Sequence, residues 1–259
     1  MPECRLAAFY TEKSSHLDRI FTALKEASRH DEYAVTLPSP FSSHGDGWGY
    51  AGVSLGRGES LAVYKTTAPI WEGEAPAMPP PLVAILHARK ASSHTPVNLP
   101  AAHPYLVAAS DGTLLAVAQN GGVSRSGLAG LLDSLGAPHP KPESVSDSHL
   151  YAYLIAHLYS GDTRSLAEIL EEAYLLVERR GLKHRCLNTM ALALTPRGEV
   201  ELAATRHIKT VNKAVLDYCE LFTVEAEGLR AVVSSTVARH LAEYNPVALG
   251  ENRALSVYP

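Results

Sequence analysis

The chain has 259 residues, 46% hydrophobic and 19% charged, enough to bury a sizeable core in one domain. A formal net charge of −4 gives no electrostatic reason to expect nucleic acid or an anionic membrane surface as a partner. The three cysteines are widely spaced and form no CxxC pair, which argues against a disulfide framework or a structural zinc site. There is neither an apolar leader nor a run of about 18 apolar residues. We therefore expect a cytoplasmic protein with reduced thiols and a small neutral or zwitterionic substrate.

The first half of the chain predicts a strand, a helix and a series of short strands. Residues 4–10 form an apolar run typical of a strand, and apolar residues from Leu17 to Leu24 follow at helical spacing. Ser14 and Ser15 precede that helix and resemble its cap. Further β-like runs, separated by Gly, Pro and Ser, occupy 47–55, 60–67, 82–89 and 113–119.

The second half predicts two helices and a return to strands. The segment 146–158 carries one apolar stripe behind the cap Ser146, and 165–181 carries a second stripe closed by Gly181. Runs typical of strands, with short links that suit antiparallel hairpins, occupy 187–195, 199–207, 220–226 and 229–235. Blocks of strands and helices without βαβ alternation favour an α+β layered fold over a doubly wound parallel sheet.

Five short motifs follow one another in a particular order. They are ECRLAAFY, HGDGWGYAG, LHARKAS with NLPAAHPY, AQNGG and SDSH. Each is weak alone, but the ordered set resembles the glutaminase domain of class II glutamine amidotransferases. The resemblance is greatest to stand-alone members that have a Cys-Arg start and an Asp-Gly-Trp-Gly motif. By motif it covers roughly the first 160 residues, and by element order it extends loosely to Thr236.

The resemblance implies a fold and a mechanism. The fold is the four-layer αββα sandwich of N-terminal-nucleophile hydrolases, with two antiparallel sheets flanked by helices. In this family an N-terminal cysteine, here Cys4, attacks the γ-carboxamide of glutamine, releases ammonia and forms a γ-glutamyl thioester that water hydrolyses. The free α-amine acts as the base, which suits its ordinary pKa of about 7.7–8.0.

The resemblance also assigns roles to residues further along the chain. Asn120 and Gly121 would donate to the oxyanion, although an Asn-Gly pair is also a common hairpin turn. Arg89 would clamp the substrate's α-carboxylate with help from Ser92, although an arginine at a strand end is also an ordinary solvated charge. Asp147 would bind the α-ammonium group, a role compatible with its place in the first turn of a helix.

Other residues are expected near the nucleophile without touching the substrate's reacting atoms. The glycines of the motif that contains Gly47, Trp48 and Gly49 allow close backbone approach, and His103 shapes a loop over the pocket. We expect no cofactor and no metal, because His44 and Asp46 have no third ligand at a supporting spacing. Gln119 stands where the family usually has a histidine.

The sequence therefore predicts one domain over residues 4–259, with Met1-Pro2-Glu3 as a removable propeptide. Catalysis by this mechanism requires removal of the tripeptide, because a peptide nitrogen cannot act as the base. Glutamine hydrolysis is the leading hypothesis. The alternatives are a stand-alone γ-glutamyl peptide hydrolase and a silent relative that binds a ligand or partner. The sequence leaves open whether the chain has an ammonia-accepting partner protein and whether it forms a homo-oligomer.

Overall fold

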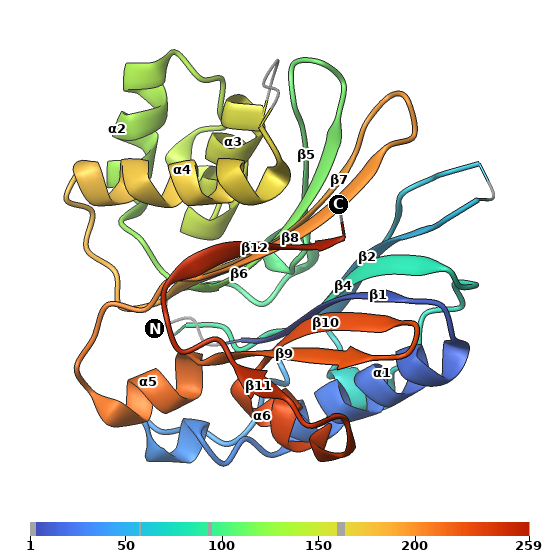
Figure 1. Cartoon of the computed structure of the whole chain (residues 1–259). Helices are drawn as coiled ribbons and strands as arrows, with labels where there is room; N and C mark the ends of the chain where they lie inside the picture. Colours follow the sequence, from blue (N-terminus) through green and yellow to red (C-terminus); the bar gives the residue numbers. More distant parts are fainter. Residues whose placement is uncertain (1–3, 57, 93–94, 160–163, 259) are drawn as a thin grey trace.

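Two antiparallel β-sheets lie face to face at the centre of the computed structural model (Figure 1), which describes residues 4–56, 58–92, 95–159 and 164–258. One sheet has the strand order β11-β9-β10-β1-β4-β2-β3, and the other has the order β12-β8-β7-β6-β5. The strands are β1 (Arg5–Thr11), β2 (Trp48–Ser54), β3 (Ala62–Thr66), β4 (Leu82–Ala88), β5 (Tyr105–Ala108), β6 (Leu114–Gly121), β7 (Leu187–Leu194), β8 (Val200–Arg206), β9 (Leu221–Ala226), β10 (Leu229–Ser234), β11 (Val247–Ala248) and β12 (Arg253–Tyr258).

Helices cover the outer face of each sheet and complete four αββα layers (Figure 1). The seven-stranded sheet is covered by α1 (Ser14–Arg29) and α6 (Ser235–Arg239), with α5 (Lys213–Cys219) beside α6. The five-stranded sheet is covered by α2 (Arg125–Leu135), α3 (Asp147–Tyr159) and α4 (Leu166–Arg179). Short 3₁₀ turns occupy Ala34–Thr36, Ile70–Glu72, Leu99–Ala101, Pro142–Ser144 and Ala242–Tyr244. The architecture is the expected α+β sandwich of two antiparallel sheets.

Strand β1 is a central strand with both faces buried. Leu6 and Ala8 face the core between the two sheets, whereas Ala7 and Phe9 face α1 on the other side. This alternation follows from the two-residue repeat of a strand, in which successive side chains point to opposite faces. Because β4 and β10 pair with β1 on either side, the start of β1 is fixed inside the sandwich.

The beginnings of the helices differ from the sequence expectation at one place. Ser14 and Ser15 do not cap α1, because Ser14 is its first residue and Lys13 takes the cap position without a side-chain hydrogen bond. The Thr11 hydroxyl organises this turn instead, donating to the Lys13 carbonyl at 3.0 Å and accepting from its N–H at 3.1 Å. At α3 the expected cap is present, since Ser146 Oγ accepts from the His149 N–H at 3.1 Å.

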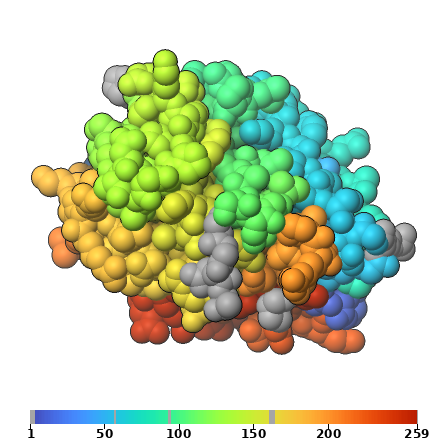
Figure 2. All heavy atoms as spheres, turned by 90° about the horizontal axis from the view of Figure 1, so that it is seen from above, coloured from blue at the N-terminus to red at the C-terminus, as the bar shows by residue number. Residues whose placement is uncertain are grey.

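Several elements were not predicted from the sequence. Strands β5, β11 and β12 and helices α2, α5 and α6 fall in segments for which no element was expected. Seen from above, α2 and α4 cover part of the molecular surface beside the segment around β5 and β6, drawn in green (Figure 2). Among the helices that the structure describes, none is long and apolar enough to cross a membrane.

Candidate active site

Cys4 lies at the junction of the two sheets. It immediately precedes β1, is 2% exposed, and its main-chain nitrogen donates to Oδ1 of Asn120 at 3.2 Å. Asn120 belongs to β6, in the opposite sheet. The thiol-bearing residue and a side-chain amide from a segment 116 residues away are therefore brought together by the packing of the two sheets.

A buried polar network holds the residue after Cys4. The Arg5 guanidinium pairs with Asp31, which also accepts from the Thr236 hydroxyl at 2.7 Å and contacts His44 Nε2 at 2.7 Å. Burial alone would raise the pKa of Asp31, but attraction by Arg5 and hydrogen bonds from His44 and Arg5 outweigh it and hold that pKa well below its usual range. The carboxylate thus stays charged and ties three segments to the start of β1.

Tyr218 adds a second support on the same side. The Arg5 guanidinium carbon lies 3.9 Å from the centre of the Tyr218 ring, and Arg5 Nη1 donates to the Tyr218 carbonyl at 2.9 Å. The Tyr218 hydroxyl lies 3.5 Å from the Cys4 carbonyl oxygen. The backbone of Cys4 is therefore contacted by Asn120 from the five-stranded sheet and by Tyr218 from α5.

The Asn120-Gly121 pair ends a long strand and does not form a hairpin turn. In the β6–β7 ladder, Asn120 lies opposite Asn188 and Gly121 opposite Leu187. Gly121 has φ of +125°, and a Cβ atom there would lie 1.9 Å from the carbonyl oxygen of Cys186. Only glycine fits this position, both for its backbone angle and for the close approach of the neighbouring strand.

The glycine-rich segment after His44 fixes the backbone around Arg89. The Asp46 N–H donates to the Arg89 carbonyl at 3.0 Å, and the Arg89 N–H donates to the Gly47 carbonyl at 2.8 Å. The Asp46 carboxylate accepts from the Ala91 N–H at 2.8 Å. Arg89 is 4% exposed, so the alternative that it is an ordinary solvated charge is wrong.

The remaining motif residues support the pocket from behind. Trp48 is buried and its ring lies 5.5 Å from that of Phe21, on the outer face of the sheet. At Gly49 a Cβ atom would lie 2.4 Å from the His103 carbonyl oxygen. Gly47 and Gly49 thus let neighbouring chain segments approach closely, as the sequence suggested, while Trp48 belongs to the core.

Asp147 begins α3 and faces the same region. Its Oδ2 accepts from the Val123 N–H at 3.0 Å. Burial raises the pKa of this carboxyl above its ordinary value, against the opposing effect of hydrogen bonds from the backbone N–H groups of Val123, Ser148 and Asp147 itself. A cationic group that entered the pocket would stabilise the charged form.

A cavity of about 310 Å³ brings together half of the residues that the sequence singled out. Cys4, Arg89, Ser92, His103 and Asp147 all line it. Asn120 and Gly121 line an adjoining cavity of about 660 Å³, which also has Asp147 in its wall. The smaller cavity is lined by three cationic side chains, Arg89, Lys90 and Arg125, together with the Asp147 carboxylate and Cys4. It offers groups of both charges to a small zwitterion.

Histidines near this cavity are held neutral. The rings of His87 and His103 lie 4.2 Å apart. Burial, followed by the charges of Arg89 and His44, lowers the pKa of His87 to about 3. Burial also lowers the pKa of His103 well below its usual value, with His87 and Arg89 adding to the effect. In the described part of the chain no group of three or more His, Cys, Asp or Glu side chains is arranged to hold a metal ion.

Sequence reasoning missed the residues that hold Cys4 from behind. Asp31, Thr236 and Tyr218 lie outside the motifs, and their partners are far away in the chain. The one available signal was Arg5, a charged residue inside an apolar strand, since a buried charge needs a partner of opposite sign.

Comparison with known proteins connects this geometry to a fold. No protein-family model matches the sequence, and no curated protein matches it at a significant level. A solved structure of glutamine phosphoribosylpyrophosphate amidotransferase from B. subtilis, complexed with ADP and GMP, covers 98% of this chain with a TM-score of 0.59 and 16% identity. The chain has the class II glutamine amidotransferase fold.

A second solved structure, described as the allosteric regulatory enzyme of purine biosynthesis, covers 98% of the chain with a TM-score of 0.60 and 16% identity. This chain spans 49% of the length of each of the two. At such low identity the likeness establishes the fold. The expected N-terminal-nucleophile hydrolase sandwich is thus confirmed.

Proposed function

We propose that the chain is a glutamine amidohydrolase that works through a γ-glutamyl thioester on Cys4. The observation that carries the proposal is the contact between the Cys4 nitrogen and Asn120 Oδ1 at 3.2 Å, beside a cavity lined by Arg89 and Asp147. The amidotransferase fold agrees with this chemistry. Glutamine is the default substrate because the cavity offers one partner for each charged end of an amino acid.

The substrate's two charged ends would orient it before the reaction. The Arg89 guanidinium, with five donors in a planar fork, suits a bidentate contact with the α-carboxylate, and the Ser92 hydroxyl lies in the same cavity. The Asp147 carboxylate suits the α-ammonium group. Binding at both ends would direct the γ-carboxamide towards Cys4.

The reaction then proceeds in two steps. The Cys4 sulfur attacks the carbonyl carbon of the γ-carboxamide while the thiol proton passes to the α-amine of Cys4, and the Asn120 amide and the Gly121 N–H stabilise the oxyanion. The C–N bond breaks, and ammonia leaves with the proton held by the amine. Water then attacks the thioester, which releases glutamate and restores the thiol.

The α-amine must be free for this mechanism. In the full chain the nitrogen of Cys4 is part of a peptide bond and cannot accept a proton. Met1, Pro2 and Glu3 lie outside the described residues, and we propose that they form a propeptide whose removal activates the enzyme. The single domain would then cover residues 4–259.

Two alternative functions are considered beside glutamine hydrolysis. The large cavity next to Asn120 favours a γ-glutamyl peptide hydrolase, whose leaving group needs more room than ammonia. A silent ligand-binding or partner-binding relative would result if the tripeptide were retained. A cytoplasmic location, an ammonia-accepting partner protein and a homo-oligomer also remain proposals.

The test compares three forms of the protein. A chain that begins at Cys4, released from a cleavable fusion, should liberate ammonia from glutamine. The chain that begins at Met1 should not, and neither should the processed chain that carries Cys4→Ala. A γ-glutamyl chloroketone should label the processed chain at Cys4 and leave the Ala variant unlabelled. Equal turnover by the processed chain and its Ala variant would refute the nucleophile assignment.

A further inference from the structure

Asp46 holds the segment that carries Arg89 from outside the catalytic cavity. Four consecutive residues, Arg89 to Ser92, contribute to the wall of the smaller cavity, whereas Asp46 is not part of that wall. The Asp46 side chain is 26% exposed and is directed at this segment by the contacts described next. Any effect of Asp46 on a ligand in the cavity is therefore transmitted through the segment that begins at Arg89.

Main-chain hydrogen bonds extend the β2–β4 ladder to Arg89. The regular ladder ends where Trp48 lies opposite Ala88. Beyond this pair the Arg89 N–H donates to the Gly47 carbonyl at 2.8 Å, and the Asp46 N–H donates to the Arg89 carbonyl at 3.0 Å. Both polar groups of the Arg89 main chain are therefore tied to the segment that precedes β2.

The Asp46 carboxylate supplies the next partner in place of a main-chain carbonyl. Its Oδ2 accepts from the Ala91 N–H at 2.8 Å and lies 3.1 Å from Lys90 Nζ. Because Ala91 is partly buried, its N–H needs a partner, and a carboxylate accepts a stronger hydrogen bond than a neutral carbonyl. The pair with Lys90 is partly exposed and adds little. The contact with Ala91 is thus the main restraint on the chain directly after Arg89.

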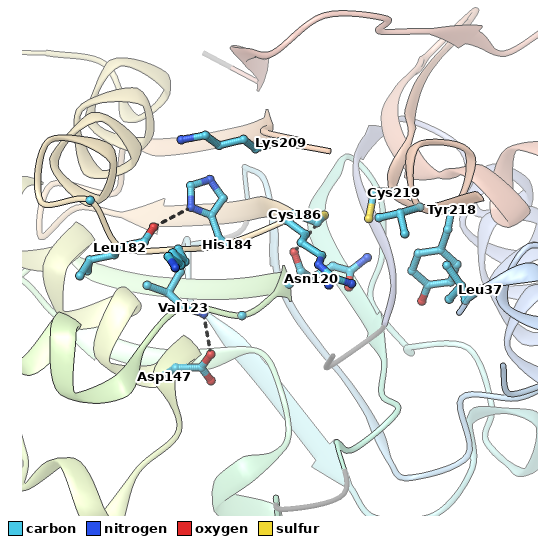
Figure 3. A pocket seen from close by; sticks show the side chains of 16 residues that line it. Leu37, Asn120, Val123, Asp147, Leu182, His184, Cys186, Lys209, Tyr218 and Cys219 are labelled. Carbon is cyan, nitrogen blue, oxygen red and sulfur yellow. Dashed lines mark hydrogen bonds between the residues drawn. The ribbon is translucent and has the colours of Figure 1, made fainter. Parts of the chain in front are cut away.

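The two groups proposed to bind the ends of the substrate are held in different ways. Asp147 is held by its own carboxylate, which accepts from the Val123 N–H at 3.0 Å (Figure 3). The Arg89 guanidinium is 4% exposed and donates through Nη1 to the Pro96 carbonyl at 3.1 Å. The opposite edge of the guanidinium, formed by Nε and Nη2, suits a bidentate contact with a carboxylate. The direction of that edge depends on where the main chain of Arg89 lies.

We propose that Asp46 is a positioning residue for substrate binding. Through its hydrogen bond to the Ala91 N–H, it sets where the Arg89 guanidinium meets the substrate's α-carboxylate. The inference rests on the proposed function. A bidentate contact needs both nitrogens of the fork in place at once, so a small shift of this segment weakens the contact strongly. Asp46 therefore acts on the binding of substrates that carry the α-carboxylate and leaves the chemical step unchanged.

The kinetic test compares glutamine with 4-aminobutanamide, which has the same carboxamide and amine without the α-carboxylate. In the chain that begins at Cys4, Asp46→Ala should raise KM for glutamine about tenfold and change kcat little, as expected for one weakened contact between charged groups. For 4-aminobutanamide, kcat/KM should change less than about twofold. Equal losses for the two substrates would overturn the proposal.

A conservative variant identifies the contact through which Asp46 acts. The side-chain oxygen of Asp46→Asn can still accept from the Ala91 N–H, but the charge that pairs with Lys90 is lost. This variant should keep KM for glutamine within about threefold of the unsubstituted chain. An asparagine variant as impaired as the alanine variant would refute the role of the Ala91 contact.

A double-mutant cycle tests whether Asp46 acts through Arg89. Added to Arg89→Lys, the Asp46→Ala substitution should raise KM for glutamine less than about twofold further, because the group that it positions is already lost. Independent effects that multiply would overturn the proposal. The matched control is Asp111→Ala. Asp111 accepts from the Thr113 N–H at 2.9 Å in the turn before β6, at the opposite end of that strand from Asn120. The control removes the same kind of contact and should leave KM unaltered.

Failure of the positioning role is distinguishable from failure of the proposed function. Hydrolysis of glutamine with an unchanged KM in Asp46→Ala would overturn the positioning role and leave the proposed function intact. If no form turned over glutamine, the proposed function would fail. Calorimetry on the unprocessed Cys4→Ala chain then tests Asp46 alone, because glutamine should bind about tenfold more weakly when Asp46→Ala is added. Equal affinities, or no binding to either chain, would refute the role.

A further variant serves if the alanine variant does not fold. Asp46→Glu keeps the charge and displaces the carboxylate by one methylene group. It should raise KM for glutamine at least about threefold and leave kcat/KM for 4-aminobutanamide unchanged. Equal changes for the two substrates, or an unchanged KM for glutamine, would count against Asp46 as a positioning residue.

Discussion

The main-chain nitrogen of Cys4 lies 3.2 Å from Oδ1 of Asn120, and this contact joins the two sheets. Because Asn120 uses its oxygen here, its Nδ2 group is the part of the amide suited to donate to an oxyanion. The distance between nucleophile and donor is therefore set by how closely the sheets pack. Any change in that packing would act on the reaction directly.

Replacing Asn120 by alanine should lower kcat for the processed enzyme by about 10²–10³ and change KM little, because the lost donor acts in the transition state. Steady-state ammonia release measures both values. Asn188→Ala is the matched control, since Asn188 lies directly opposite in β7 and donates to the Cys219 carbonyl at 2.6 Å. It should lower the free energy of unfolding by about 1–3 kcal/mol and retain kcat. An equal loss of kcat in both variants would contradict the oxyanion role.

Replacing Arg89 by lysine should raise KM for glutamine at least about tenfold, because a single ammonium cannot reproduce a bidentate contact worth about 1.5–3 kcal/mol. The kcat value should change less. Arg29→Lys, the same substitution at the exposed last residue of α1, serves as the control and should leave KM unaltered. An unchanged KM in Arg89→Lys would remove Arg89 from the substrate site.

Replacing Gly121 by alanine should destabilise the fold, since the new Cβ atom would lie 1.9 Å from the Cys186 carbonyl oxygen and φ is +125°. We expect a loss of more than about 2 kcal/mol in the free energy of unfolding, measured in urea. Gly130→Ala is the control, because nothing lies within 4 Å of a Cβ atom at that helical position. It should stabilise the protein by about 0.5–1 kcal/mol. Similar values for the two variants would show that β6 does not have the described register.

Replacing Asp31 by asparagine should cost about 3–5 kcal/mol of folding free energy, because Arg5 would be left buried without its carboxylate. Asp217→Asn breaks the exposed pair between Lys213 and Asp217 and should cost no more than about 0.5 kcal/mol. Urea denaturation of both variants checks the difference. A loss below about 1 kcal/mol in Asp31→Asn would refute the buried network.

The buried His87 should make the protein less stable in acid. Its pKa is lowered to about 3 in the folded state, chiefly by burial, against about 6.5 in an unfolded chain. Between these values the unfolded chain binds more protons, so stability falls as the pH falls, by about 1.4 kcal/mol per pH unit for one such group. In His87→Phe the slope of unfolding free energy between pH 4.5 and 6, chosen to lie within this window of roughly 3 to 6.5, should decrease by about that amount. An unchanged slope would show that His87 is not buried as a neutral group.

Local patterns predicted the elements whose signals lie within a few residues of each other. The two-residue repeat of β1 and the apolar stripes of α3 and α4 fall in this class. Helix α2 was missed although Ser124 caps it and Gly136, with φ of 66°, ends it. Two glycines inside this helix, Gly127 and Gly130, weaken its helical signal.

The residues of the site also fall into two groups, those that local patterns predict and those whose contacts depend on the whole fold. Cys4, Arg89 and Asp147 occur in recognisable motifs, and the fold brings them to one cavity. The contact of Asp31 with Thr236, by contrast, spans 205 residues. No local pattern marks such a pair, because its existence depends on the arrangement of the whole sheet.

The position of β1 has a practical consequence for anyone who dissects this protein. The motifs end at His149, yet β1 pairs with β10, and β6 pairs with β7, which both come from the last third of the chain. A fragment limited to the motifs would leave two apolar strands with open edges, which favour aggregation. Truncated or fused forms of the protein should therefore keep the chain at least through β10, since a boundary drawn from the motifs alone would cut through both sheets.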